Sequence, residues 1–518
     1  MRRYKVRTLG DWIRLHAKRS PRTEAFVAGD GRVTFGEAAG QAWRLARGLR
    51  AAGIGDGDVV GVLGGNTVFN AQVLLGVAAA GGIYGAYNWR WSAEELAHGI
   101  AESNADLIVT EERFEDLLTR ALDILASRPD ATPAPRVVRQ GEIASLLGDS
   151  GAPVEETIGP EDGLCLIFTG GSTGTSKAVL LSHRAALANA LNERLDCRLG
   201  DAPDERALMS TPMFHSAGVL TWLVTHFVAG KTTIMVDRFE PDEFVNWVTR
   251  ERATNTFLIP NMARQLMQAG AFADPGVRRS FRALHTGAGL LRMPDKERFF
   301  EQLPEGRLYF RYGLTEGGPM VSRLLHEDIL RPEADGSIGQ EYSLVEMTLL
   351  SLDDEEQVGP GELGEICVRG PSLMTGYYRR PAETAEAMRG GWLHTGDLAI
   401  RDEHGYYFFK DRVKEMIKTG GENVYCVEIE QILYLHPAVL EAAVVGVPST
   451  TWDEEVRAVV VLRDGMSVSD QELATYLRQH LAGYKIPKKF SFLKADELPR
   501  TGAGKLVKTR LKEKLGWM

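Results

Sequence analysis

The sequence predicts an α/β fold with a large N-terminal body of layered α/β subdomains, a small β subdomain and a mobile C-terminal α+β lid domain. Amphipathic helical segments alternate with short apolar strands in the first half of the chain, which is typical of parallel α/β layers. After about residue 330, short β-like runs alternate with turn residues. A chain of 518 residues also exceeds what one hydrophobic core usually organises.

The N-terminal body begins with a predicted helix over residues 37–54, where alanines and leucines recur on one face until Gly53. An apolar strand over 58–63 follows, then a helix from Val73 to Ala80 and a short apolar run near Ile83. The same alternation returns later in the chain. It predicts a strand at 163–169, a helix at 183–195 and a strand at 231–236.

Two segments connect or follow these layers. Residues 127–160 are rich in Pro, Gly, Asp and Ser, which predicts exposed connecting segments. Residues 346–370 alternate β-like runs with turn residues and predict the β-rich subdomain.

The C-terminal part is predicted to form an independent unit. It contains the apolar runs 441–447 and 458–465, and Ser469 with Glu472 has the spacing of a capping box that opens a helix. We therefore expect an N-terminal domain over residues 1–411 and a lid domain over residues 412–518.

Composition excludes several classes of function. The formal net charge is −10, which argues against a nucleic-acid groove as the main function. No run reaches the ~20 apolar residues that a membrane span requires. The four cysteines include no C-x-x-C pair, and the histidines do not cluster at metal-ligand spacing, so we expect a cytoplasmic protein.

The stretch 167–183, "IFTGGSTGTSKAVLLSH", raises the question of a phosphate-binding loop. A Walker A loop requires Gly-Lys-Ser/Thr, but Lys177 lies between Ser176 and Ala178, so that pattern fails. Backbone N–H groups, hydroxyl groups and the lysine could still bind an anion. A plain strand-to-helix turn is the alternative for this segment alone.

Four further motifs follow in order: "RYGLTEGGP" (311–319), "WLHTGDLAI" (392–400), "FKDRVKEMIKTGGENVYCVEIE" (409–430) and "LPRTGAGKLVKTRL" (498–511). Together with the loop, they resemble the signature motifs of the adenylate-forming superfamily of acyl-CoA synthetases, luciferase-like enzymes and adenylation domains. The resemblance spans almost the whole chain. It implies that a carboxylate attacks the α-phosphate of ATP to give an acyl-adenylate and pyrophosphate, with Mg²⁺ as cofactor, before the acyl group passes to an acceptor.

The resemblance assigns roles around the nucleotide. Thr315 would contact the α-phosphate, Glu316 would hold Mg²⁺, and Tyr312 would stack on adenine beside Ala288. Without the motif, Glu316 would be a solvated loop carboxylate and Tyr312 a core residue. The residues implied for the β- and γ-phosphates are Ser172, Thr173, Gly174, Thr175 and Lys177.

Further roles fall on the C-terminal motifs. Asp397 would accept the ribose hydroxyls, and Arg412 would add a ribose or phosphate contact, or pair as a surface arginine. Lys414 would lie at the hinge of the lid. Lys505 would serve adenylation by stabilising charge between carboxylate and α-phosphate, and Lys418 would serve the second half-reaction.

The acyl pocket is predicted from two segments. Phe214, His215 and Gly218 resemble residues that border the acid, although a Phe-His pair on an apolar run is also common in cores. Gly287 would form a pocket wall. Together with Ala217 and Met320, the small residues predict a roomy apolar cavity for aromatic, alicyclic or medium-chain acids.

The acceptor is the least determined feature. Gly420 and Gly421 are typical of members that use coenzyme A, because backbone without side chains lets a thiol approach. Ala178 and Cys426 replace the usual Gly and Pro, and they leave open an amide synthetase that uses an amine. Loading of a carrier protein and a nucleotide-binding regulator without turnover are further alternatives; the latter is disfavoured by the presence of both Lys505 and Glu316.

Overall fold

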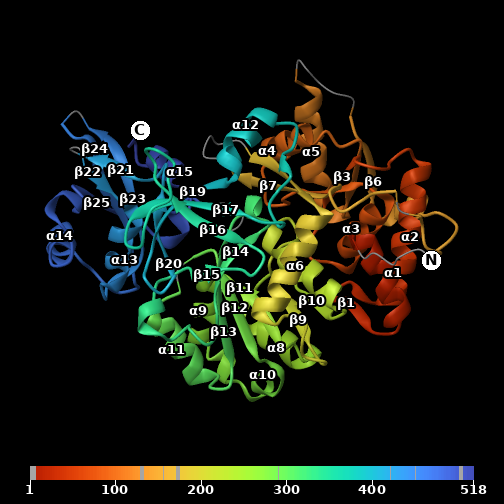
Figure 1. The fold of residues 1–518 in the computed structure, drawn as a ribbon, viewed down its shortest axis with the longest axis horizontal. Coiled ribbons are helices and arrows are strands. Elements are labelled where there is room, and N and C mark those ends of the chain that lie inside the picture. Colours follow the sequence, from red (N-terminus) through yellow and green to blue (C-terminus); the bar gives the residue numbers. More distant parts are fainter. Residues whose placement is uncertain are drawn as a thin grey trace. The chain divides into compact units, whose positions relative to one another are not determined.

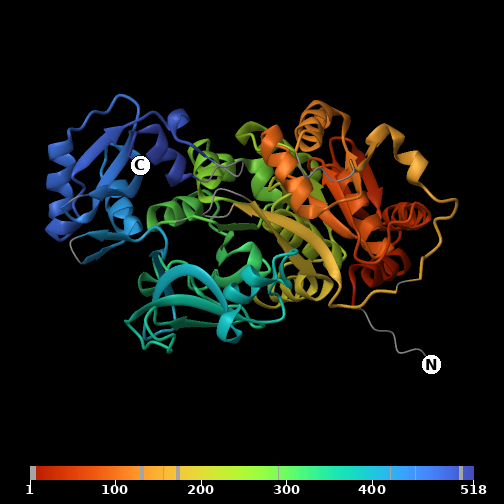
Figure 2. The same ribbon diagram turned by 90° about the horizontal axis from the view of Figure 1, so that it is seen from above.

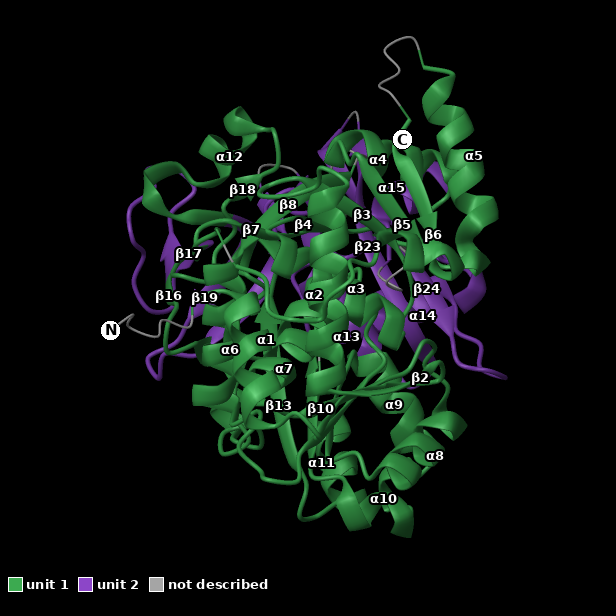
Figure 3. Cartoon of the chain, turned by 90° about the vertical axis from the view of Figure 1, so that its right-hand side faces the viewer, with its two compact units in different colours: residues 1–347, 367–394 green, residues 348–366, 395–518 purple. Residues whose placement is uncertain are grey.

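The computed structural model divides the chain into two compact units. The first unit comprises residues 1–347 and 367–394, and the second comprises residues 348–366 and 395–518 (Figure 3). The structure describes residues 7–128, 134–155, 157–170, 176–289, 291–419, 422–449, 451–500 and 506–517.

The first unit contains a seven-stranded sheet with the order β18-β8-β7-β4-β3-β5-β6 (Figure 1). Its strands are β3 (Val59–Leu63), β4 (Ile83–Ala86), β5 (Leu107–Thr110), β6 (Arg136–Arg139), β7 (Gly163–Gly170), β8 (Ser176–Ser182) and β18 (Gly376–Tyr377). The strands from β7 to β6 in this order pair in parallel, whereas β8 is antiparallel to both of its neighbours. The strands predicted at 58–63 and 163–169 are therefore confirmed.

Helices accompany this sheet along the chain. They are α1 (Leu9–Arg19), α2 (Phe35–Ala51), α3 (Val68–Ala80), α4 (Ala93–Ser103), α5 (Glu115–Ala126), α6 (His183–Cys197) and α12 (Pro381–Ala387). Helix α2 begins at a capping box formed by Thr34 and Glu37. Helix α3 begins five residues before the predicted start, because the Thr67 side chain accepts the N–H of Asn70 and caps it there.

The first unit also contains a nine-stranded sheet, with the order β15-β14-β13-β12-β11-β9-β10-β1-β2. Its strands are β1 (Glu24–Ala28), β2 (Gly31–Thr34), β9 (Arg206–Met209), β10 (Thr232–Met235), β11 (Asn255–Leu258), β12 (Ala283–Gly287), β13 (Arg307–Gly313), β14 (Met320–Leu324) and β15 (Gln340–Glu341). The associated helices are α7 (Thr225–Ala229), α8 (Pro241–Glu251), α9 (Pro260–Gln268), α10 (Pro275–Ser280) and α11 (Met293–Gln302). Strand β10 confirms the strand predicted at 231–236, and α6 confirms the helix at 183–195.

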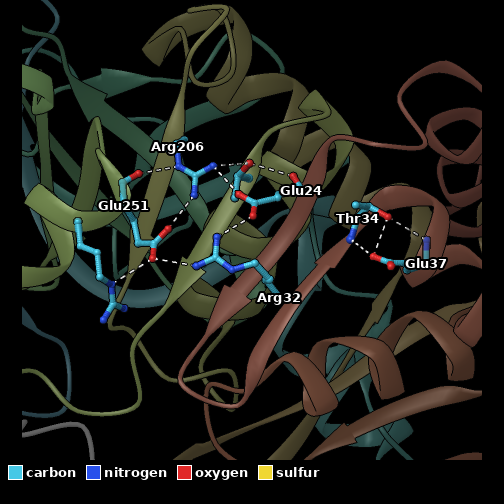
Figure 4. A network of polar contacts seen from close by, with 8 residues as sticks. Glu24, Arg32, Thr34, Glu37, Arg206 and Glu251 are labelled. Atoms are coloured by element: carbon cyan, nitrogen blue, oxygen red, sulfur yellow. Dashed lines mark hydrogen bonds and ion pairs between the residues drawn. The ribbon is translucent and has the colours of Figure 1, made fainter.

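A network of charged side chains ties one end of this sheet together (Figure 4). Arg206 of β9 lies 2.9 Å from Glu24 of β1 and 3.1 Å from Glu251 at the end of α8. Arg32 of β2 bonds the same two carboxylates, at 2.7 and 3.1 Å. Because Glu251 is buried, its three arginine partners, Arg32, Arg206 and Arg250, compensate a charge that would otherwise be costly.

A four-stranded sheet has the order β16-β17-β19-β20. Its strands are β16 (Glu346–Leu350), β17 (Leu363–Arg369), β19 (Leu393–Arg401) and β20 (Tyr407–Arg412). Figure 2 shows them as a small group of strands in green and cyan. The predicted β-rich subdomain is thus confirmed.

The C-terminal part of the second unit is α+β, as predicted. Its strands and helices are β21 (Ile417–Thr419), β22 (Glu422–Val424), β23 (Val439–Ser449), β24 (Asp453–Leu462), β25 (Lys489–Phe492), α13 (Cys426–Leu435), α14 (Asp470–Arg478) and α15 (Lys508–Lys514). Alternate residues of β23 and β24 enter two different core clusters, one with α13 and α14 and one with Leu511 and Trp517. Ser469 and Glu472 form the expected capping box of α14.

The prediction for residues 127–160 is partly wrong. Residues 136–139 form β6, which pairs in parallel with β5, and residues 140–146 form a 3₁₀-helix. Strand β6 lies at the end of its sheet, where a short run with two arginines suffices and the sequence therefore lacks a strong apolar signal. Among the described residues, no helix is both long and apolar enough to cross a membrane.

Candidate functional site

The predicted phosphate loop joins two antiparallel strands, β7 and β8, rather than a strand and a helix. Ser172, Thr173, Gly174 and Thr175 lie outside the described residues. Lys177 is described and pairs with Thr169 across the hairpin. Ala178 is fully buried and packs in a core cluster with Val59 and other apolar residues, so its methyl group fills core space.

Lys177 contacts two side chains that the sequence analysis did not single out. Its Nζ lies 2.6 Å from Glu383 Oε2 on α12 and 4.8 Å from the centre of the Tyr377 ring on β18. The Lys177 side chain keeps 25% of its surface exposed. Glu383 is its one carboxylate partner within the described parts of the chain, and a half-buried ammonium can exchange such a partner for an anionic ligand.

Thr315 and Glu316 form a 3₁₀-turn directly after β13. Glu316 Oε1 accepts a hydrogen bond from the Tyr377 hydroxyl at 3.1 Å and lies 3.4 Å from Thr169 Oγ1. Burial and the nearby Glu316 charge raise the pKa of Tyr377, so its hydroxyl remains a donor at neutral pH. Lys177 and Glu316, predicted from separate motifs, therefore meet at one tyrosine.

Thr315 lies beside the predicted acyl segment. Its Oγ1 is 3.0 Å from Ser216 Oγ, and Ser216 directly follows His215. The hydroxyl pair links the turn that follows β13 to the segment preceding the π-helix Ala217–Val224.

The residues predicted to contact adenine lie on neighbouring strands. Gly287 at the end of β12 pairs with Arg311 in β13. Ala288 and Tyr312 are the next residues after this pair. Tyr312 is half-buried and Ala288 is exposed. Ala288 has a φ of +61°, a conformation that costs a non-glycine residue energy and often occurs at binding sites.

Phe214 and His215 belong to an aromatic cluster. Their ring centres are 4.5 Å apart, and Phe214 meets Trp89 edge-on at 6.0 Å. Trp89 stacks on Phe114 at 5.6 Å, and the Arg90 guanidinium lies 4.8 Å from the Trp89 ring centre. These additional aromatic residues were missed, although "YNWRW" directly after the apolar run at Ile83 is a visible signal.

Burial and the nearby Arg90 charge lower the pKa of His215 to about 4. The imidazole is therefore neutral at physiological pH. Its buried Nε2 has no hydrogen-bond partner among the described residues. The His215 Nε2 atom can thus form a hydrogen bond with a ligand, and the neutral ring places no charge in the pocket.

The predicted pocket glycines are explained by backbone packing. A Cβ at Gly218 would lie 2.3 Å from the Pro212 carbonyl oxygen, and one at Gly287 would lie 2.5 Å from that of Arg311. Both positions require glycine because neighbouring backbone approaches closely. Their smallness therefore does not by itself measure the size of a cavity.

The second unit contains Asp397 and Arg412, which form a cross-strand pair of β19 and β20. Arg412 Nε lies 3.3 Å from Asp397 Oδ1, and the Asp397 side chain is only 9% exposed. The Thr-Gly-Asp segment lies within β19 rather than in a turn, but Gly396 has a φ of +73°, a conformation that favours glycine. Lys414 follows in the turn between β20 and β21.

Lys418 is exposed on β21, where it pairs with Asn423. Its backbone N–H donates to Glu454 Oε2 at 2.9 Å. Gly420, Gly421 and Lys505 lie outside the described residues.

A buried charged cluster near Lys414 was not predicted. Lys508 Nζ lies 2.9 Å from Glu430 and 3.1 Å from Glu415, while the backbone N–H of Cys426 donates to Asp411. Burial raises the pKa of Asp411 to about 6. The usual proline at position 426 has no N–H and could not make this bond.

Comparison with known proteins identifies relatives over the whole chain. The family model described as AMP-binding enzyme matches residues 13–378, and the model described as AMP-binding enzyme C-terminal domain matches residues 428–505. A feruloyl-CoA synthase of Amycolatopsis sp is 35% identical over 510 residues, which cover 98% of this chain and 99% of that protein.

Solved structures are also similar. ATP-bound MatB from Rhodopseudomonas palustris has a TM-score of 0.88 and 27% identity, covering 98% of this chain and 99% of that one. The amide bond synthetase McbA from Marinactinospora thermotolerans has a TM-score of 0.85 and 28% identity, with the same coverage. The proteins similar to this chain thus include one named as a CoA synthase and one named as an amide bond synthetase.

Proposed function

Because this chain belongs to the AMP-binding enzyme family and is an acid-activating ligase, we propose that it forms an acyl-adenylate and then transfers the acyl group to coenzyme A. In the first step a carboxylate oxygen attacks the α-phosphorus of ATP and pyrophosphate leaves. The carrying observation is that Lys177 and Glu316, from motifs about 140 residues apart, converge on Tyr377.

Charge neutralisation is the main requirement of this step. Lys177 and the loop residues Ser172 to Thr175 would bind the β- and γ-phosphates, and Thr315 would contact the α-phosphate. Lys505 would reach the reacting oxygens from the lid. Asp397 would accept the ribose hydroxyls, with Arg412 holding its carboxylate, and adenine would lie against Tyr312 and Ala288.

The residues present suit Mg²⁺. Within the described residues, the Thr169 and Tyr377 hydroxyl groups both contact Oε1 of Glu316, so that Oε2 is available to a hard cation. When bound, Mg²⁺ would supply positive charge to the leaving pyrophosphate. Glu316 would hold the ion.

The acid pocket would be bordered by Phe214, His215, Gly218 and Gly287. The aromatic cluster of Trp89, Phe114 and Phe214 favours a flat, aromatic acid, because aromatic rings pack edge-on or offset against one another. The similarity to a feruloyl-CoA synthase supports the same class of substrate.

For the second step, residues 412–518 would act as a lid that turns about Lys414 and brings Lys418, Gly420 and Gly421 to the acyl-adenylate. Coenzyme A is supported by a surface beside Thr419, the last described residue of β21. Thr419 pairs with Asp453, and the preceding Trp452 is 48% exposed, with Lys488 Nζ 6.0 Å from its ring centre. An indole face and an ammonium suit an adenine and a phosphate.

The replacements that raised doubt about coenzyme A lie in packed surroundings. Ala178 packs within the first unit, and Cys426 is buried at the start of α13. Neither therefore argues for an altered acceptor. The four cysteines are all free and buried, which fits the proposed cytoplasmic location.

Pyrophosphate release with hydroxycinnamic, benzoic and octanoic acids tests the first step, and product masses with coenzyme A or amines test the second. We expect release with the aromatic acids and a thioester product. If none of the acids causes pyrophosphate release, the chain would be a nucleotide-binding protein without turnover. An amide in place of a thioester would favour the second candidate, amide synthesis, which the similarity to McbA supports.

Trp452→Ala tests the acceptor surface. Loss of one stacking contact, worth about 1–3 kcal/mol, should raise the KM for coenzyme A about tenfold while pyrophosphate release stays unchanged. Phe492→Ala, which removes another exposed aromatic side chain of the same unit, is the control. An unchanged KM in Trp452→Ala would remove the structural support for coenzyme A.

A further inference from the structure

A short segment of the first unit, residues 376–387, packs across the hairpin of β7 and β8. It comprises β18 and α12, and we call it the strap. Its first strand pairs antiparallel with β8, which places Tyr377 opposite Val179 and diagonal to Lys177. The strap is closed on itself, because the Tyr377 N–H donates to Thr384 Oγ1 at 2.9 Å and that hydroxyl donates to the Arg380 carbonyl at 2.8 Å.

Arg380 connects the strap to helix α4. Its guanidinium lies 2.5 Å from Glu102 on α4 and 2.8 Å from Glu383 on α12. Glu383 in turn bonds Lys177 at 2.6 Å. The strap therefore has a defined position on the body of the first unit, set by ion pairs and a strand ladder.

The two adjacent tyrosines of the strap have different surroundings. Tyr378 packs against a hydrophobic core cluster that includes Val59 and Ile83. Tyr377 instead directs its hydroxyl to Glu316 Oε1 and presents its ring to Lys177. Tyr378 directly follows β18, and its N–H donates to the Ala178 carbonyl at 2.8 Å, so its packing in the core cluster helps to fix the backbone that carries Tyr377.

We propose that Tyr377 is a positioning residue that holds the Glu316 carboxylate in the orientation required for the metal ion. The proposal rests on the proposed function, in which Glu316 is the metal ligand. A carboxylate on a short turn can rotate, and the Tyr377 hydroxyl fixes one oxygen so that the other faces the ligand side. The Lys177 ammonium over the same ring couples the metal carboxylate to the phosphate-binding lysine.

The test measures metal binding directly. Mn²⁺ is titrated into the protein with α,β-methylene-ATP, which cannot be cleaved at the reacting position, and free Mn²⁺ is followed by electron paramagnetic resonance. Tyr377→Phe removes only the hydroxyl group and should weaken Mn²⁺ binding about tenfold or more. Tyr378→Phe, the matched control on the next residue, should change it less than twofold.

Two further measurements separate positioning from general damage. Binding of the analogue without metal should be the same in Tyr377→Phe as in the unmodified protein, and so should the thermal midpoint. If Tyr377→Phe also loses binding of the analogue in the absence of metal, the pocket is distorted and the proposal is overturned.

Glu316→Gln distinguishes this inference from the function on which it rests. If Glu316→Gln abolishes Mn²⁺ binding and Tyr377→Phe weakens it, the inference holds. If Glu316→Gln abolishes binding while Tyr377→Phe behaves like Tyr378→Phe, the inference falls and the metal role stands. If Glu316→Gln binds Mn²⁺ as well as the unmodified protein, both are wrong.

Discussion

Lys177 in the first unit and Lys508 in the second unit differ in what surrounds their charge. Among the residues that the structure describes, Lys177 has one carboxylate partner, Glu383, and its side chain is 25% exposed. Lys508 lies between Glu430 and Glu415, and its Nζ is fully enclosed. The surrounding acids raise the pKa of Lys508 well above its usual value, because they favour the charged form.

The difference separates a lysine available for a ligand from a lysine used for structure. An enclosed ammonium that already has two carboxylates gains nothing from a phosphate that it cannot reach. A half-exposed ammonium with one surface ion pair, worth only about 0–1 kcal/mol, can exchange that partner at little cost. Both lysines occur in motifs, so the motif alone does not tell them apart.

The largest effect is expected for Lys508→Met. It leaves Glu430 and Glu415 without their cation, and breaking a buried ion pair typically costs about 3–5 kcal/mol. Because Glu415 is 34% exposed, we expect a loss near the lower end of that range in the free energy of unfolding of the second unit. Urea unfolding followed by tryptophan fluorescence measures it. Lys514→Met on the same helix is the control, and equal stability of the two variants would contradict the structural role of Lys508.

Lys177→Met should have the opposite signature. Loss of a charged hydrogen bond to phosphate, worth about 1.5–3 kcal/mol, should lower kcat/KM for ATP by roughly 10- to 100-fold. The thermal midpoint should hardly change, because the ion pair with Glu383 is partly exposed. Pyrophosphate release and a melting curve on the same sample test both parts. Full activity would remove Lys177 from the site.

A smaller, pH-dependent effect is expected at Asp411. Its folded-state pKa of about 6 lies above the ordinary value of 3.8, so the folded protein binds the proton more tightly than the unfolded chain. The stabilisation is complete below pH 3.8 and is lost as the pH rises through 6. The free energy of unfolding of Asp411→Asn, measured relative to the unmodified protein, should therefore rise by about 1–3 kcal/mol from pH 4 to pH 8. Urea unfolding at both pH values measures it, and parallel pH profiles would refute the assignment.

Much of the fold was predictable because local rules and packing agree. The helix after Thr34 and the helix after Ser469 both carry capping boxes, and the apolar runs that became β3 and β7 are buried strands. Strand β6 was missed because its four residues include two arginines. Only pairing with β5 makes that segment a strand.

The candidate site was predictable where motifs are contiguous. Thr315 and Glu316 stand together in one turn, and Asp397 lies beside Arg412 in the ladder of β19 and β20. Tyr377 was not found, since its function depends on a strand pairing that joins residues about 200 positions apart. Trp89 and Arg90 were missed for the same reason, because their aromatic partner Phe214 lies on a distant segment.

The sequence by itself determined the layered α/β class, the capping box that opens α14 and the identity of the charged residues in each motif. These depend on periodicity and on side chains only a few residues apart. Tertiary structure decided which lysine keeps an accessible charge, why glycine is required at 218 and 287, and that a tyrosine joins two motifs. Such properties arise from distances between segments remote in sequence, which only the packed chain defines.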